Sequence, residues 1–100
     1  MTTDRELLEL AAKAAGIEII EWSCIEESCD AIARLEDRRL HKWNPLTDDG
    51  DALRLAVKLN IPIFPYEDET STGTIGVVAK GFFDKYENTR RAIVRAAAAI

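Results

Sequence analysis

Two cysteines and a single histidine are the residues that come closest to forming a metal or redox site. Cys24 and Cys29 are separated by four residues, which matches neither a redox Cys-x-x-Cys motif nor the usual zinc-finger pair. His41 would supply a third zinc ligand, but the sequence offers no convincing fourth. Buried cysteine usually behaves as a small apolar side chain. We therefore predict no metal and no cofactor.

Three acidic side chains, Asp48, Asp49 and Asp51, form the densest cluster of oxygen ligands. A calcium loop requires alternating oxygen ligands followed by a distant bidentate glutamate, and this spacing is absent here. The cluster instead stands where a helix is predicted to begin, and acids in a first turn are stabilised by the helix dipole. The sequence favours a capping role over metal binding.

No pattern of an enzyme active site emerges from the remaining polar residues. His41 is suited to general-base catalysis near neutral pH, but it lies in the basic run 38–42 and spacing gives it no nucleophile. Ser28 and Ser71 occupy no nucleophile-elbow pattern, and the glycines form no phosphate-binding loop. We predict no catalytic residues, and the chain is expected not to be an enzyme.

Basic and aromatic residues provide the best candidate interaction surface. Arg90, Arg91 and Arg95 lie on a predicted terminal helix and are suited to phosphate contacts. Trp43 precedes Asn-Pro and is either a packing residue or an anchor for a partner, a role that tryptophan often fills. The arginines have a plainer interpretation as a solvated helix face that complements the helix dipole.

Composition limits the class of protein without identifying a partner. The 100 residues correspond to one domain, 1–100, and 47% hydrophobic with 31% charged residues is typical of a globular protein. The net charge of -5 argues against a dedicated nucleic-acid binder. Residues 1–37 hold ten acids and three bases, whereas residues 80–100 hold five bases and two acids.

No run approaches the ~20 apolar residues of a membrane span, and no apolar segment follows the first residues as in a signal peptide. We expect a cytosolic chain with reduced cysteines.

The first half of the chain predicts a helix followed by strands. Thr3 and Glu6 form a capping box, and Gly16 is placed to end a helix over Thr3–Ala15. Residues 17–22 are rich in β-branched side chains and predict a strand. Residues 24–43 fit either a helical face or a hairpin with a turn at 36–39, and we predict the hairpin.

The second half predicts a helix, two strands and a last helix. Residues 47–49 cap a helix that Asn60 and Pro62 end. Residues 61–66 predict an edge strand because of their prolines, 67–73 a polar loop, and 74–79 an antiparallel partner strand. Asp84 and Glu87 suggest a capping box before the terminal helix.

The order α-β-(β-β)-α-β-β-α predicts an α+β fold. Three amphipathic helices and a small sheet can share one core only as layers. We expect a small three-layer α/β/α sandwich with a mainly antiparallel sheet and three helices.

Three segments resemble the phage ABA-sandwich domain family of small phage and prophage proteins. They are DRELLELAAKAAGI at 4–17, WNPLTDDGDALRLAVKL at 43–59 and TRRAIVRAAA at 89–98, about two fifths of the chain. The resemblance implies a three-layer fold and a bacteriophage context, in the cytoplasm of the bacterial host. It implies no activity.

The sequence therefore predicts a non-catalytic phage or prophage accessory protein that acts by binding a phage or host protein. Its candidate interaction surface comprises Trp43, Arg90, Arg91 and Arg95. The alternative is a weak nucleic-acid binder that uses the basic residues of the terminal helix. The acidic total charge disfavours that alternative, and no membrane partner is expected.

Overall fold

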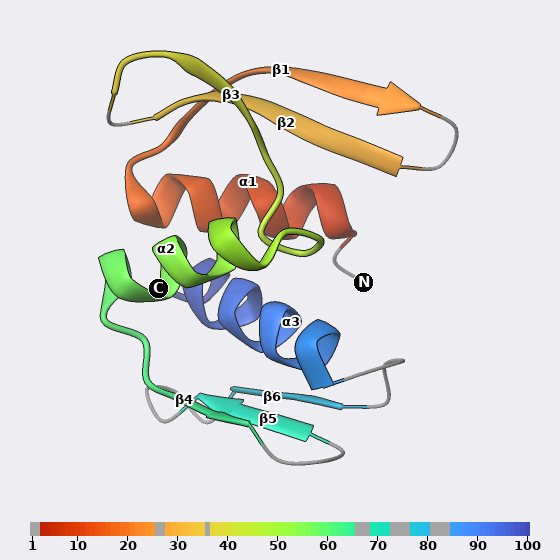
Figure 1. The fold of residues 1–100 in the computed structure, drawn as a ribbon, viewed down its shortest axis with the longest axis vertical. Helices are drawn as coiled ribbons and strands as arrows, with labels where there is room; N and C mark the ends of the chain where they lie inside the picture. The colour runs from red at the N-terminus through yellow and green to blue at the C-terminus, as the bar shows by residue number, and fades with distance from the viewer. Residues whose placement is uncertain (1–2, 26–27, 36, 66–68, 73–76, 81–84) are drawn as a thin grey trace.

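The helices of this protein lie between two antiparallel sheets in the computed structural model (Figure 1). The structure describes residues 3–25, 28–35, 37–65, 69–72, 77–80 and 85–100. The helices of this part of the chain are α1 (Asp4–Ala15), α2 (Asp49–Leu59) and α3 (Lys85–Ala98). The first sheet has the order β1 (Glu18–Ile25), β2 (Ser28–Arg34), β3 (Leu40–Trp43). The second has the order β4 (Ile63–Pro65), β5 (Glu69–Thr72), β6 (Val77–Lys80).

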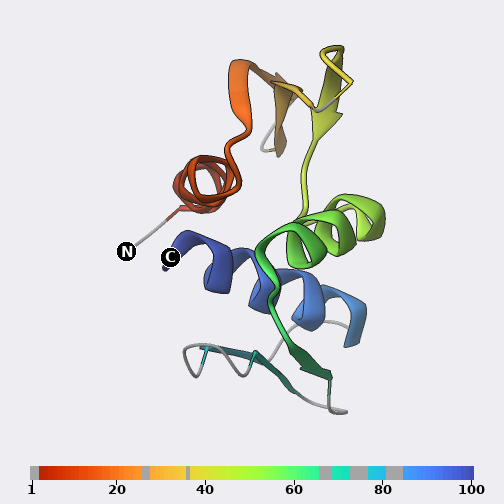
Figure 2. The same cartoon turned by 90° about the vertical axis from the view of Figure 1, so that its left-hand side faces the viewer.

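The α+β class with antiparallel sheets is confirmed, but its layers are arranged differently from the α/β/α sandwich that we predicted. Helices α1 and α2 lie between the first sheet and α3, and the second sheet packs on the far side of α3 (Figures 1 and 2). The helices pack on one another because alanine supplies most of the core. Small side chains let helices approach closely. The buried alanines of this core cluster are Ala11, Ala12, Ala15, Ala31, Ala33, Ala52, Ala56, Ala96 and Ala97.

The predicted ends of the first two helices are confirmed by their capping geometry. The Glu6 backbone N–H donates to Thr3 Oγ1 at 3.1 Å, and Gly16 takes the left-handed conformation with φ 70°. The Asp51 N–H donates to Asp48 Oδ2 at 2.8 Å, and Asn60 ends α2 at φ 54°. Both helices therefore begin and end where local side-chain chemistry dictates.

The hairpin predicted within residues 24–43 is also confirmed, as strands β2 and β3. Ala31 pairs with Trp43 and Arg34 pairs with Leu40 in an antiparallel register. Strand β1 runs to Ile25, beyond the predicted residue 22, because its last residues pair with the first residues of β2.

The region from residue 61 to residue 80 differs from the prediction. Strand β5 lies within the stretch that we predicted as a polar loop, and β4 pairs with β5 rather than with β6. The threonines of β5 explain this, since a β-branched side chain favours strands whether or not its neighbours are apolar. The edge position of β4, with its proline, is confirmed. Residues 74–76 of the predicted strand and Asp84 of the predicted capping box lie outside the described residues.

A buried asparagine connects the first sheet to α2. The backbone N–H of Asn44 donates to Asp51 Oδ2 at 3.0 Å, and its side-chain Nδ2 donates to Asp30 Oδ1 at 2.8 Å. Asn44 Oδ1 accepts the Leu46 N–H at 3.0 Å, and its carbonyl accepts the Asp48 N–H at 2.9 Å. We call Asp30, Asn44 and Asp51 the Asn44 hub. It fixes the position of α2 relative to β2 and β3.

We expect Asn44→Ala to lower the free energy of unfolding by about 2–3 kcal/mol, because it leaves the buried Leu46 N–H without its acceptor and Asp30 with Lys42 as its remaining partner. Urea denaturation followed by circular dichroism measures the loss. Asn44→Asp keeps the acceptor for Leu46 but brings a second carboxylate to Asp30, so it should be at least as destabilising. A loss below about 0.5 kcal/mol for Asn44→Ala would show that the hub does not hold the fold.

Candidate functional site

The structure places Trp43 in the core. Its side chain is 3% exposed and packs among Ala31, Leu55 and the other members of the core cluster. The interpretation that Trp43 packs in the core is therefore confirmed. Its part in an interaction surface stays a prediction, because the buried side chain also lines a groove between α2 and the first sheet. Trp43 was singled out in the sequence because it precedes Asn-Pro, and in the structure these residues form the packed connection around the Asn44 hub.

Arg90 connects α3 to the start of α2. Its Nε donates to the Leu46 carbonyl at 2.8 Å, and its Nη1 donates to Asp49 Oδ1 at 2.6 Å. The side chain is only 17% exposed. Arg90 therefore stabilises the turn that follows the Asn44 hub and does not present its charge on an open surface.

Arg91 joins α3 to α1 in the same manner. Its Nη1 and Nη2 donate to the two carboxylate oxygens of Asp4 at 2.7 and 3.0 Å, a bidentate pair. Arg95 lies half-buried one turn further along α3, and its charge also acts on Asp4. Arg90 and Arg91 are thus paired with Asp49 and Asp4, which argues against an open basic surface on this helix. The interaction surface that we predicted there stays a prediction. Neither joins Trp43 in one site.

The Arg91 guanidinium, by hydrogen bonding to Asp4, holds the pKa of that carboxyl below its usual value, although burial opposes the shift. The folded pKa is depressed, so Asp4 stabilises the fold above its unfolded pKa of about 3.9. That contribution is lost as pH falls through the folded value.

We expect Asp4→Asn to cost about 1 kcal/mol near neutral pH, because solvent screens the Asp4 carboxylate, which is 60% exposed, although Arg91 itself is only 17% exposed. The difference from wild type should shrink toward zero below about pH 4, as Asp4 becomes protonated in both states. Urea denaturation across this pH range measures it. Glu9→Gln is the matched control, since it removes an exposed acid from the same helix without contacting Arg91. A difference that does not change with pH would contradict the assignment.

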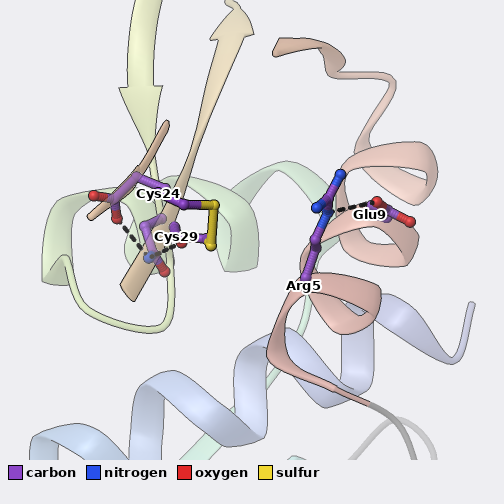
Figure 3. Close-up of a disulfide and its surroundings, with 6 residues drawn as sticks. Arg5, Glu9, Cys24 and Cys29 are labelled. Carbon is purple, nitrogen blue, oxygen red and sulfur yellow. Dashed lines mark hydrogen bonds and ion pairs between the residues drawn. A yellow bond between two sulfur atoms is a disulfide. The ribbon is translucent and has the colours of Figure 1, made fainter. Parts of the chain in front are cut away.

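The two cysteines form a disulfide, so the expectation of free thiols is wrong. Cys24 and Cys29 are directly paired residues of β1 and β2, and the sulfur atoms are joined near the Arg5–Glu9 ion pair of α1 (Figure 3). Their separation is visible in the sequence, but the register of the hairpin, which brings the two side chains together, is not. Sulfur atoms bonded to one another are not zinc ligands.

We expect Cys24→Ser combined with Cys29→Ser to reduce stability by no more than about 2 kcal/mol, since the bridged residues are only five positions apart. Strand pairing already holds this hairpin closed. Urea denaturation measures the free energy of unfolding of the double variant, of oxidised wild type and of wild type in a reductant. Global unfolding on reduction would contradict it.

His41 forms a pair with Asp37 across the β2–β3 turn. Its Nε2 lies 2.7 Å from Asp37 Oδ2, and both side chains are exposed. A hydrogen bond from the Arg39 N–H, together with His41, holds the pKa of the Asp37 carboxyl below its usual value. Among the described residues, no three His, Cys, Asp or Glu side chains gather as a metal site. The pair fixes the turn.

The strongest candidate site is an open apolar groove of about 630 Å³ between α2 and the first sheet, which we call the α2 groove. It lies where the end of α1, the end of β2 and helix α2 converge (Figure 1). Its apolar lining residues are Ile17, Leu35, Trp43, Leu53, Leu55 and Val57. Gly16 and the charged residues Arg34, Asp37, Arg54 and Lys58 complete the lining.

Two apolar side chains on the α2 wall of the groove are exposed to solvent. Leu53 is 60% exposed and Val57 is 68% exposed, one helical turn apart on the same face. The inner lining is formed by Leu55 and Trp43, which are buried. Leu53 and Val57 stand beside the apolar stripe of α2 in the sequence, but the sequence analysis did not identify them as a site. The feature that could have revealed the site is that these two apolar residues lie outside the helix face that packs into the core.

Comparison of the chain with protein-family models, with curated proteins and with solved structures gives no match. The resemblance to the phage ABA-sandwich domain therefore stays a prediction. No helix among the described residues has the length and apolar character to cross a membrane.

Proposed function

We propose that this chain is a non-catalytic protein-interaction module and that the α2 groove is its docking surface. The observation that carries the proposal is the exposure of Leu53 and Val57 on the wall of an apolar groove. An apolar surface that stays in contact with water is stabilised when a partner covers it. Contiguous surfaces of this kind are typical of interaction sites.

The chemistry of the groove supports binding rather than catalysis. Among the residues that the structure describes, its lining carries no hydroxyl, thiol or imidazole group, so the serine, cysteine and histidine chemistry of most hydrolases has no group there. The polar side chains of the described lining are guanidinium and ammonium groups together with the Asp37 carboxylate, which is hydrogen-bonded to Arg39 and His41. These charges suit recognition of a partner's side chains.

The setting that we propose is a bacterial cell infected by a phage or carrying one, as the family resemblance implies. A cytoplasmic location and a phage or host protein as partner are part of this proposal. The Cys24–Cys29 disulfide is the observation against the cytoplasm, because disulfides persist mainly in oxidising compartments. Alkylation of thiols in intact cells before extraction distinguishes the two locations.

The pairing of Arg90 with Asp49 and of Arg91 with Asp4 weakens the nucleic-acid alternative. A phosphate would have to displace a carboxylate that already holds each guanidinium. We therefore do not propose nucleic-acid binding as a second function. The experiment below includes a nuclease treatment that detects it.

The test is an affinity pull-down from uninfected and phage-infected lysates, with and without nuclease, analysed by quantitative mass spectrometry. We expect wild type to capture a protein whose recovery does not change when nuclease is added. The double variant Leu53→Asp with Val57→Asp should recover at least about tenfold less of that protein, which corresponds to 1.4 kcal/mol of binding free energy. Leu10→Asp is the matched control, because Leu10 is exposed on α1 and does not line the groove. We call the Leu53→Asp, Val57→Asp double variant the groove variant. The proposal is refuted if this variant captures the same proteins as wild type, or if nuclease abolishes the capture by wild type.

A further inference from the structure

We propose that the Cys24–Cys29 disulfide is a reversible redox site, which a dithiol reductant of the thioredoxin class opens by attack on the Cys24 sulfur. The protein stays folded in both redox states, and the change is confined to the end of the β1–β2 hairpin. This inference does not rest on the proposed function, because neither cysteine lines the α2 groove.

The disulfide closes the end of a hairpin that strand pairing already holds together. Cys24 pairs directly with Cys29, and Ser23 pairs with Asp30 beside them. The bridged residues are only five positions apart, so the bridge removes little entropy from the unfolded chain and adds little to the stability of the fold. The same free energy sets how much harder the bridge is to reduce in the folded protein than in the unfolded chain, because the two equilibria form one thermodynamic cycle. The fold therefore protects this bridge only weakly against reduction.

The bridge is open to an external thiol from the β1 side. Cys24 is exposed, whereas Cys29 is partly buried. Ile25, the next residue of β1, is 73% exposed, and Figure 1 shows this end of the hairpin extending beyond the first turn of α1. A thiolate must reach the sulfur that it attacks, and exposed disulfides are the ones that serve as labile or regulatory bridges. A reductant therefore reaches Cys24 first, and Cys29 is the thiolate that departs.

Reduction proceeds as two thiol–disulfide exchanges. A thiolate of the reductant attacks Cys24 Sγ and bonds to it, while the bond to Cys29 Sγ breaks and its electron pair leaves on Cys29. The second thiolate of the reductant then attacks its partner sulfur in this mixed disulfide, and Cys24 departs as a thiolate. The reductant is oxidised by two electrons to a disulfide, and each cysteine takes up one of the protons that the dithiol gave up. Oxidised glutathione reverses the change by two exchanges of the same kind and is itself reduced to two thiols.

The Asn44 hub limits how far the hairpin opens after reduction. Asn44 Nδ2 donates to Asp30 Oδ1 at 2.8 Å and to the Cys29 carbonyl at 3.5 Å, so this part of β2 stays attached to the turn into α2. The next residue of β2, Ala31, is fully buried in the core. Reduction therefore frees the last residues of β1 and leaves the rest of the first sheet in place.

The redox state changes a surface that is separate from the α2 groove. An open hollow of about 720 Å³ lies beside the hairpin end, and Ile25 and Cys29 line it together with Leu8 and Leu46. Movement of the end of β1 moves one wall of this hollow. None of these four residues lines the α2 groove, so we expect reduction to leave binding in that groove unchanged.

The experiment treats the intact oxidised protein with reduced thioredoxin and, separately, with dithiothreitol, and counts free thiols by alkylation and mass spectrometry. We expect both reductants to open the bridge while far-UV circular dichroism stays native. Dithiothreitol should act on the folded protein within about tenfold of its rate on the urea-unfolded chain. Oxidised glutathione should then restore the internal disulfide without a lasting glutathione adduct, because strand pairing keeps the two thiols opposite each other.

Hydrogen exchange measures how far the change spreads. On reduction, amide exchange should become at least about tenfold faster at the end of β1 and stay unchanged in α1 and α2. Cys24→Ser combined with Cys29→Ser is the matched control, because it has no bridge to lose. This double variant should show the exchange pattern of reduced wild type and should not respond to reductant.

The attacked sulfur is identified with the two single variants, each of which keeps one thiol. The aromatic disulfide dithionitrobenzoate should react at least about threefold faster with Cys29→Ser, which keeps Cys24, than with Cys24→Ser, which keeps Cys29. Equal rates, or the reverse order, would overturn the assignment of Cys24.

Three results would overturn the redox site as a whole. The first is reduction of the folded protein more than about a hundredfold slower than reduction of the unfolded chain. The second is loss of native circular dichroism, or faster exchange throughout α1 and α2, when the bridge opens. The third is a stable glutathione adduct in place of the restored internal disulfide.

Discussion

The buried amide of Asn44 is the interaction on which the rest of the structure depends. It links Asp30 on β2 with the turn into α2, while its backbone N–H binds Asp51 on the helix itself. Buried polar groups are costly unless each finds its partner, so these bonds allow one placement of α2 against the first sheet. The α2 groove has its shape because α2 and the end of β2 are held in that placement.

Features encoded by neighbouring residues were predictable from the sequence. Thr3, Gly16 and Asn60 set helix ends through bonds to residues a few positions away, and the β2–β3 hairpin follows from a local turn. The order of layers was not predictable in this way. It depends on alanine faces of helices meeting one another, and an alanine stripe is compatible with packing on either a sheet or a helix. Strand β5 was predicted as part of a polar loop, because its β-branched residues stand among polar ones.

The candidate site was less predictable than the fold. Arg90 and Arg91 were identified as a basic surface because their partners, Asp49 and Asp4, are more than 40 residues away in sequence. Cys24 and Cys29 became a pair only once the strand register placed them opposite each other. Leu53 and Val57 belong to an apolar stripe, and the sequence alone does not show which part of a stripe the core leaves uncovered.

Helix α3 contacts α1, α2 and every strand of the second sheet, yet it follows all of them in the chain. During synthesis on a ribosome, the alanine faces of α1 and α2 therefore lack their largest helical partner until residues 85–98 have left the exit tunnel. The hairpins of both sheets, β1–β2–β3 and β4–β5–β6, are local and can form earlier. The nascent chain passes through a stage in which its helices expose the surfaces that later form the core, and chaperones that bind apolar segments would meet it there.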